Sequence, residues 1–411
     1  MTFSRLIFLM LVLLMQSTIA LADHSAHWKI SGYGTLGLVE DDTDGAGFVR
    51  ELVQPANVKN PSTIRSDTRP VLTDSRLGLQ AVYIPSDSIE VMSQLVFRHQ
   101  KENTLEESLE WLHVGFNIDP NLKVRLGRVG YDGFLMSDHR HLGYAYAWVR
   151  PPTEFYGAIP MYRLDGADLS YTTGLEDEVS WQFKLQAGKG GTIFPFGNGQ
   201  YDYKADIWTA SAVRNSGPWS MRLGFSEMAI TSAPPLDTLL TQLNGLVGAI
   251  SAGVDVEINN LIQNMRYDNT TLTLSSLGLS YDDGDWIMQA ELGRLETESD
   301  MVSNGTMGYL AVGKRIDRFT PYLIYSQFEN GSAEYKPQQN WGGASTLQTI
   351  AINTINSTRI EQKTISMGMR WDMDNNIALK FQWDHTQIEK NGYGLWWLES
   401  SAKGLDQEGN V

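Results

Sequence analysis

Charged side chains of opposite sign gather in two neighbouring parts of this sequence. The cations lie in or beside short segments of alternating apolar and polar residues; they are Arg76, Arg98, Lys123, Arg125 and Arg128. The acids lie in the long segment that follows; they are Asp132, Asp138 and Glu154. If the two groups face each other across a gap, their field orders water and favours polar solutes over apolar ones. Each arginine could instead be an ordinary solvated charge or an anchor for a loop.

The acids belong to a stretch that begins as a strand near Val124 and then loses any clear period as far as Gly157. Long loops in compact proteins are usually functional or disordered, and this one is too aromatic to be disordered. We therefore expect a folded loop, at about residues 130–160, that packs inside a hollow structure. Tyr144 and Tyr146 would join the acids at the narrowest point, where these rings and others could also form a binding path.

One run in this loop, Asp138-His139-Arg140-His141, suggests a metal ligand or a catalytic base. Two histidines two residues apart would point the same way on a strand, but the flanking sequence offers no third ligand at a familiar spacing. The sequence contains neither a Gly-x-Ser-x-Gly elbow nor a His-Glu-x-x-His helix. We predict no catalytic residue, no metal site, no cofactor and no enzyme activity.

The segments that must position these residues alternate with period two, as half-buried strands do. The pattern is clear in residues 179–187 and again where residues 365–371 precede residues 377–383. About fifteen such segments are joined alternately by tight turns and by long polar loops, an asymmetry typical of outer-membrane β-barrels. In such a barrel the apolar face meets lipid, the polar face lines a lumen, and aromatic residues collect at the strand ends. The alternative is an exported soluble sandwich or propeller, whose apolar face would be its core.

The N-terminus predicts export. Arg5 precedes an apolar run, and Ala20-Leu21-Ala22 forms a small-x-small cleavage site, so residues 1–22 read as a secretory signal peptide and residues 23–411 as the barrel. No later stretch has the eighteen or more apolar residues of a membrane helix. The chain has no cysteine, so it must fold without disulfides. A net charge of −16 argues against a nucleic-acid partner.

A second long loop, at about residues 230–268, carries leucines and isoleucines at helical spacing. We expect one or two short helices in an external loop. They would pack against their own barrel or a neighbouring subunit; the alternative is a lid or a receptor surface.

Four short motifs, in this order and spacing, resemble the Gram-negative outer-membrane porins of the trimeric, sixteen-stranded general-diffusion type. They are Gly32-Tyr-Gly-Thr-Leu-Gly37, Asp74-Ser-Arg-Leu-Gly-Leu79, Val124-Arg-Leu-Gly-Arg128 and Tyr162-Arg-Leu-Asp-Gly166. The resemblance implies a homotrimer in outer-membrane lipid, inserted by the barrel-assembly machinery, with a third loop that folds into the barrel and narrows it.

One feature departs from that family. Its members usually end in a strand with an aromatic last residue, whereas this chain ends Gly404-Leu-Asp-Gln-Glu-Gly-Asn-Val411. Because single-chain bacterial barrels have even strand counts, we expect a barrel of about sixteen strands of which fifteen are visible, with the closing strand absent.

The leading functional prediction is passive, water-filled diffusion of small hydrophilic solutes and ions across the outer membrane, with a weak anion preference. A substrate-selective channel for a small carboxylate or a sugar is the second reading. The third is a surface barrel for adhesion or reception.

Overall fold

A computed structural model of the chain describes most of its residues. The described ranges are 27–40, 46–48, 50–51, 56–57, 66–67, 73–99, 105–174, 177–196, 199–232, 236–266, 270–389, 395–398 and 409–410. The expected signal peptide at residues 1–22 lies outside them, as does most of the C-terminal segment.

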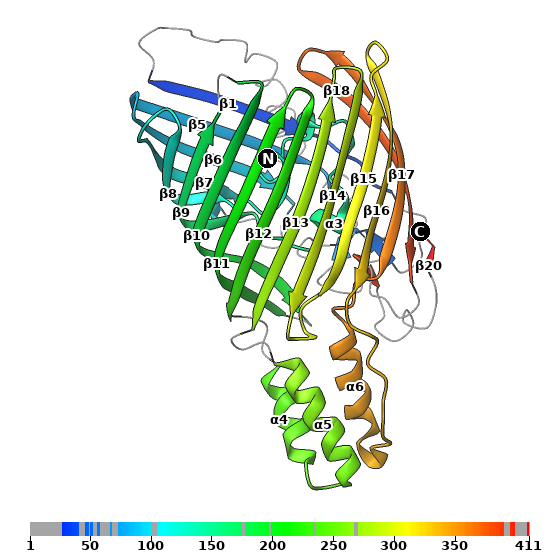
Figure 1. Cartoon of the computed structure of the whole chain (residues 1–411). Coiled ribbons are helices and arrows are strands. Elements are labelled where there is room, and N and C mark those ends of the chain that lie inside the picture. Colours follow the sequence, from blue (N-terminus) through cyan, green and yellow to red (C-terminus); the bar gives the residue numbers. More distant parts are fainter. Residues whose placement is uncertain are drawn as a thin grey trace, which may run out of the picture.

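In the part of the chain that the structure describes, fifteen long antiparallel strands and one very short one, β20 (Gly409–Asn410), form one sheet whose strands follow each other in sequence order (Figure 1). The long strands are β1 (Trp28–Thr35), β5 (Arg76–Ser86), β6 (Ile89–Arg98), β7 (Leu109–Asn117), β8 (Leu122–Gly130), β9 (Arg163–Thr173), β10 (Val179–Phe196), β11 (Gly199–Ser216), β12 (Trp219–Ser232), β13 (Thr271–Asp282), β14 (Trp286–Thr297), β15 (Gly305–Lys314), β16 (Phe319–Asn330), β17 (Gln362–Asp374) and β18 (Ile377–Ile388). The predicted all-β fold of antiparallel strands is confirmed.

The sheet curves round an interior but does not close. The two-residue strand β20 (Gly409–Asn410) pairs with the end of β18, and no pairing among the described residues joins β1 to β18 or to β20. A small second sheet joins loops from the two ends of the chain. It consists of β2 (Ala46–Phe48), β3 (Ala56–Asn57), β4 (Ser66–Asp67) and β19 (Trp396–Leu398), with β19 paired to β2.

The faces of the sheet are the reverse of those of a water-soluble protein. On the outer face Leu185 is 54% exposed and Leu223 is 61% exposed, whereas the inward side chains of Lys184 and Arg222 are buried. In a soluble sandwich the apolar face would be the core. Contiguous exposed apolar surface on this scale indicates contact with another apolar phase, so the structure excludes the sandwich alternative.

Aromatic residues mark one limit of the apolar outer face and charges mark the other. At the turn end of the strands, Trp28 packs on Tyr83 and Trp219 on Tyr281, with ring centroids 4.7 and 4.6 Å apart. Nearer the loop end, a row of alternating charge crosses four strands in register; it consists of Arg128, Asp165, Lys189 and Asp206.

Glycines with positive φ form tight turns at one end of the sheet, and the strands differ in length. Gly217, with φ of 54°, forms the tight turn between β11 and β12, and Gly284, with φ of 94°, forms that between β13 and β14. The wall is uneven in height, because β10 and β11 have 18 residues each while β7 and β8 have 9.

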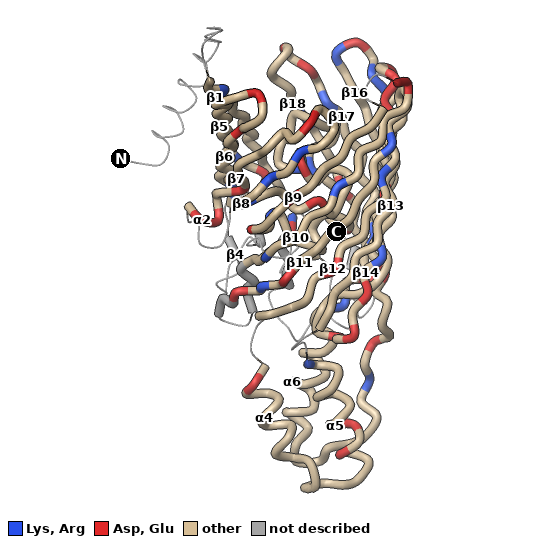
Figure 2. The backbone as a smooth tube through the Cα atoms, turned by 60° about the vertical axis from the view of Figure 1, so that its left-hand side comes forward, with Lys and Arg blue, Asp and Glu red and all other residues tan. Residues whose placement is uncertain are grey.

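Three helices extend beyond the loop end of the sheet (Figure 1). The loop after β12 forms α4 (Asp237–Leu246) and α5 (Ala252–Met265), and the loop after β16 forms α6 (Ser345–Asn356), which the sequence analysis did not predict. We call α4, α5 and α6 the helical projection; it carries few charges (Figure 2). Among the described residues, no helix has both the length and the apolar character needed to cross a membrane.

The helical projection has a core of its own. Leu243, Ile258 and Leu261 are buried there with Trp341. Glu257 is also buried, and its carboxylate accepts hydrogen bonds from the backbone N–H groups of two residues and from an indole. The donors are Gln338 at 2.7 Å, Gln339 at 3.0 Å and Trp341 Nε1 at 2.9 Å. This carboxylate therefore ties α5 to the chain segment before α6.

We expect Glu257→Ala to loosen the helical projection and to leave the sheet intact, because three donors lose their acceptor and one of them, the indole N–H of Trp341, is buried. Limited proteolysis should show faster cleavage near α5 and α6, with unchanged heat-modifiable migration of the sheet. The exposed Asn260 on the same helix provides the matched control, Asn260→Ala. Equal cleavage of the two variants would contradict this role of Glu257.

Candidate pore constriction

The third loop, residues 131–162 between β8 and β9, lies inside the curved sheet. Its helix α3 (Thr153–Tyr156) contacts β15, β16 and β17. Phe134, Trp148 and Phe155 are at most 1% exposed, and the ring of Phe155 meets the edge of Tyr309 with centroids 5.5 Å apart. The apolar side chains of the loop and the inward side chains of β11 to β16 form one core. This half of the interior is therefore filled.

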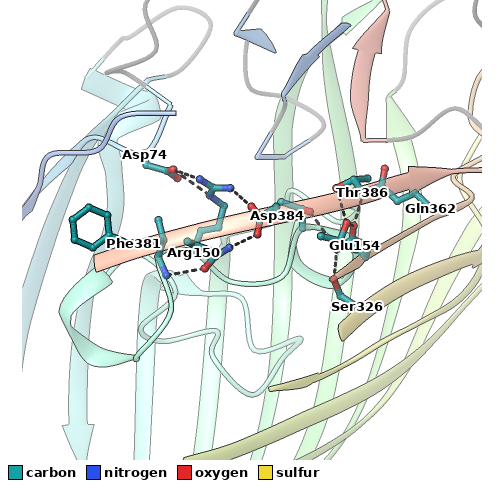
Figure 3. A network of polar contacts seen from close by, with 12 residues as sticks. Asp74, Arg150, Glu154, Ser326, Gln362, Phe381, Asp384 and Thr386 are labelled. Atoms are coloured by element: carbon teal, nitrogen blue, oxygen red, sulfur yellow. Dashed lines mark hydrogen bonds and ion pairs between the residues drawn. The ribbon is translucent and has the colours of Figure 1, made fainter. Parts of the chain in front are cut away.

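Two buried carboxylates fix the third loop to the wall. Glu154 is fully buried and accepts hydrogen bonds from three strand side chains, those of Ser326, Gln362 and Thr364 (Figure 3). Glu291, on β14, accepts from the backbone N–H of Leu135 at 2.8 Å and from the hydroxyls of Tyr156 and Tyr309. Glu154 thus points into the wall, and its carboxylate does not face the basic residues across the interior.

Arg150 links the two ends of the sheet. Its guanidinium donates through Nε at 3.1 Å and Nη2 at 2.8 Å to Asp74 Oδ2, just before β5, and through Nη1 at 2.9 Å to Asp384 on β18 (Figure 3). Burial by itself raises the pKa of Asp74, but the guanidinium groups of Arg150 and Arg50 more than offset this and lower the pKa. Arg150, itself buried, therefore bridges the seam by an ionic contact between the start of β5, which pairs with β1, and β18.

The segment that includes the short helix η1 (Gly143–Ala145) is held by cations of the last strands. Lys380 Nζ donates to the carbonyls of Gly143, Tyr146 and Trp148, and Arg370 Nη1 donates to that of Tyr144 at 2.7 Å. The hydroxyl of Tyr146 is buried and accepts from Arg76 Nη2 at 2.8 Å. Tyr144 is 39% exposed, and its hydroxyl donates to the carbonyl of Asn375 in a turn.

Three expected constriction residues retain contact with solvent on the polar side of the interior. Lys123 Nζ lies 2.6 Å from Glu90, and Arg125 Nε lies 2.9 Å from Asp168. Asp138 has a side chain that is 58% exposed and lies 3.8 Å from Lys184. The cations of this wall are therefore largely paired with acids, two of them on the same wall and one in the third loop.

Besides Glu154, two more of the expected residues need correction. Arg128 lies three residues after the inward Arg125, so alternation turns it to the outer face, where it pairs with Asp165 at 2.7 Å. It does not line the interior. Asp132 is only 8% exposed and contacts Ser211, Lys184 and Arg222, so it fixes the start of the third loop and does not face open solvent.

Arg76 and Arg98 are also buried, and they belong to an arginine cluster that the sequence analysis missed in part. Its other members are Arg50, in the loop between β1 and β5, and Arg140, in the third loop. Arg50 and Arg98 both contact Glu51 at 2.7 Å. His141 lies among these groups, and burial together with the charges of Arg98 and Arg140 holds its pKa well below the usual range. The signal in the sequence was the Arg140-His141 pair, in a run that the sequence analysis weighed only as a metal ligand or a catalytic base.

No family model matches the chain, and no curated protein matches it. Solved structures do resemble it. OmpF of Salmonella typhi in complex with daunomycin has a TM-score of 0.48 at 11% identity, covering 93% of this chain and 96% of that chain. An anion-selective porin from Comamonas acidovorans has a TM-score of 0.46 at 12% identity, covering 88% of this chain and 90% of that one. OmpT of Vibrio cholerae, in trimer form, has a TM-score of 0.32 at 12% identity, covering 76% and 92%.

We expect Arg150→Met to destabilise the fold by about 3–5 kcal/mol, because it leaves the buried carboxylate of Asp74 and the partly buried one of Asp384 without this cation. Arg315→Met is the control, since Arg315 pairs with Asp282 at a more exposed site and should cost at most about 1 kcal/mol. Urea unfolding of the refolded protein measures both. Similar midpoints for the two variants would show that the seam does not depend on Arg150.

Glu51 provides a pH test of the arginine cluster. Burial by itself raises its pKa, but Arg50 and Arg98 lower the pKa to about 2, from an ordinary value of 4.5. The stabilisation is complete above pH 4.5 and is lost as the pH falls toward 2. The thermal midpoint of the wild type should thus exceed that of Glu51→Gln clearly at pH 6, and by much less at pH 2.5. A difference that does not change with pH would contradict the pairing.

Proposed function

We propose that this protein is an outer-membrane channel of the porin type, through which small hydrophilic solutes and ions diffuse in water. The observation that carries the proposal is the inversion of its faces, with exposed leucine, phenylalanine and tryptophan outside and buried or paired charges inside. Within the sheet, the paired strands satisfy their backbone groups between neighbours, as strands that cross lipid must; the edges at β1 and β18 are the part that pairing among the described residues leaves open. Export through a cleaved signal peptide and assembly as a homotrimer complete the proposal.

The polar side of the interior supplies the passage. The third loop fills the half that faces β11 to β16, whereas Lys123, Arg125, Asp138 and Tyr144 keep solvent contact. Since most wall cations are paired with acids, we propose only a weak anion preference. Asp132 and Glu154 serve to set the position of the third loop.

A substrate-selective channel for a small carboxylate is the second candidate. The observation that favours it is the cluster of buried arginines formed by Arg50, Arg76, Arg98 and Arg140. Saturable block of the current by one solute would separate selective transport from general diffusion.

The test of the channel is single-channel conductance in a planar bilayer with a salt gradient, using the chain refolded from residue 23 onward. We expect stepwise openings in threes and a reversal potential on the anion side. A potential on the cation side would overturn the anion preference and keep the channel. Protein that migrates as folded and gives no openings would overturn the channel itself.

The Asp138→Asn variant should move the reversal potential further toward anions, because it removes an exposed acid of the constriction. The control is Lys189→Gln, since Lys189 lies on the outer face with a side chain that is 83% exposed. The control also changes the net charge by one unit, but outside the passage. If both variants shift the potential equally in size, Asp138 does not face the permeating ions.

A further inference from the structure

The arginine cluster brings together four parts of the chain around two aromatic rings. The ring of Tyr162 lies between the guanidinium groups of Arg98 and Arg140, whose Cζ atoms are 4.0 and 3.8 Å from its centroid. Tyr146 connects Arg76 to Arg140, because its hydroxyl accepts from Arg76 and donates to the backbone carbonyl of Arg140 at 3.2 Å. Arg50 is joined to Arg98 through Glu51.

Each of these four guanidinium groups has a buried N–H without an acceptor among the described residues. The atoms are Arg50 Nη1, Arg76 Nε, Arg98 Nε and Arg140 Nη1. All four residues are at most 9% exposed. A buried donor that lacks an acceptor is costly, and the cost is greater when the group is charged. Four such donors close together therefore indicate a site for an acceptor that the described residues do not supply.

Among the described residues, the charges around the cluster do not balance. The guanidinium groups that converge here are those of Arg50, Arg76, Arg98, Arg140, Arg150 and Arg163. The carboxylates paired with them are those of Glu51, Asp74, Glu110 and Asp384. Six positive charges against four negative ones leave an excess of two. His141 adds no charge at neutral pH, because its pKa is lowered.

We propose that the arginine cluster is a binding site for a small divalent oxyanion, either phosphate or a short dicarboxylate, centred on Arg76 and Arg140. Guanidinium groups bind both kinds of anion through paired N–H donors, and a divalent anion neutralises the excess charge. Arg76 and Arg98 are cross-strand partners on the inner face, so a free solute and not a lipid headgroup is the ligand. The inference rests on the proposed channel for the route by which the anion arrives.

Binding is measured on the full chain folded in detergent, by isothermal titration calorimetry with inorganic phosphate against a chloride background. We expect one saturable site per chain. Arg76→Gln and Arg140→Gln should each weaken binding about tenfold or more, since each removes charge-assisted hydrogen bonds. Glu110→Gln should strengthen binding by removing an opposing charge. The control, Arg315→Gln, alters a guanidinium in a turn and should bind phosphate as the wild type does.

Malonate, as a second probe, distinguishes the two anions: the one that binds more tightly identifies the class. Arg140→Lys is the control for folding. It keeps the positive charge, so it should bind the anion more tightly than Arg140→Gln does. Absence of phosphate and malonate binding to folded protein would overturn the site, and conductance in chloride would then still support the channel. Binding without conductance would keep the site and overturn the channel.

Discussion

The free edges of the sheet govern the rest of this structure. Backbone N–H and C=O groups on an unpaired edge have no partner in lipid, yet β1 pairs only with β5 among the described residues, and β18 pairs only with β17 and the short β20. The contacts that cross this seam come from loops. Arg150 joins Asp74 to Asp384, Tyr146 connects Arg76 to Lys380 through its hydroxyl and its carbonyl, and β19 pairs with β2. The third loop thus narrows the interior and holds the two ends of the wall together.

Burial explains why so many charges inside the sheet are paired. A buried ion costs several kcal/mol unless a partner or several hydrogen bonds compensate, and the inward carboxylates Glu154, Glu291 and Asp168 each have such donors. The charges that hold the third loop contribute little to the selectivity of a passage, because paired charges of opposite sign largely cancel each other's electrostatic field. Selectivity is left to the side chains with solvent contact and to the arginine cluster, where the balance is incomplete.

Period-two alternation was enough to predict the strands, because segments such as Val179 to Ala187 place apolar residues on one face only. The same alternation already places Arg128 on the opposite face from Arg125, because the two residues are three positions apart. The sequence analysis did not predict helix α6, because Ser345–Asn356 is rich in threonine and asparagine and its apolar stripe is short. The role of Arg150 could not be predicted, since its partners Asp74 and Asp384 lie 76 and 234 residues away, and local patterns carry no information about such pairs. Arg50 pairs with its neighbour Glu51, but Glu51 also binds Arg98, 47 residues away. The ring that Arg140 contacts, that of Tyr162, is brought to it by the folding of the third loop.

The two longest strands carry one more implication. At about 3.3 Å per residue, the 18 residues of β10 extend roughly 60 Å, about twice the hydrocarbon thickness of a bilayer. One part of the β10–β11 hairpin is therefore expected to contact lipid, and the rest to contact water. From the tight-turn end as far as Lys189 and Asp206, an apolar outer side chain is favourable because it contacts lipid. Beyond these two residues, toward the loop end, a polar outer side chain is favourable because it contacts water. A mutation from leucine to serine on that face would change the sign of its effect within a few residues along a single strand.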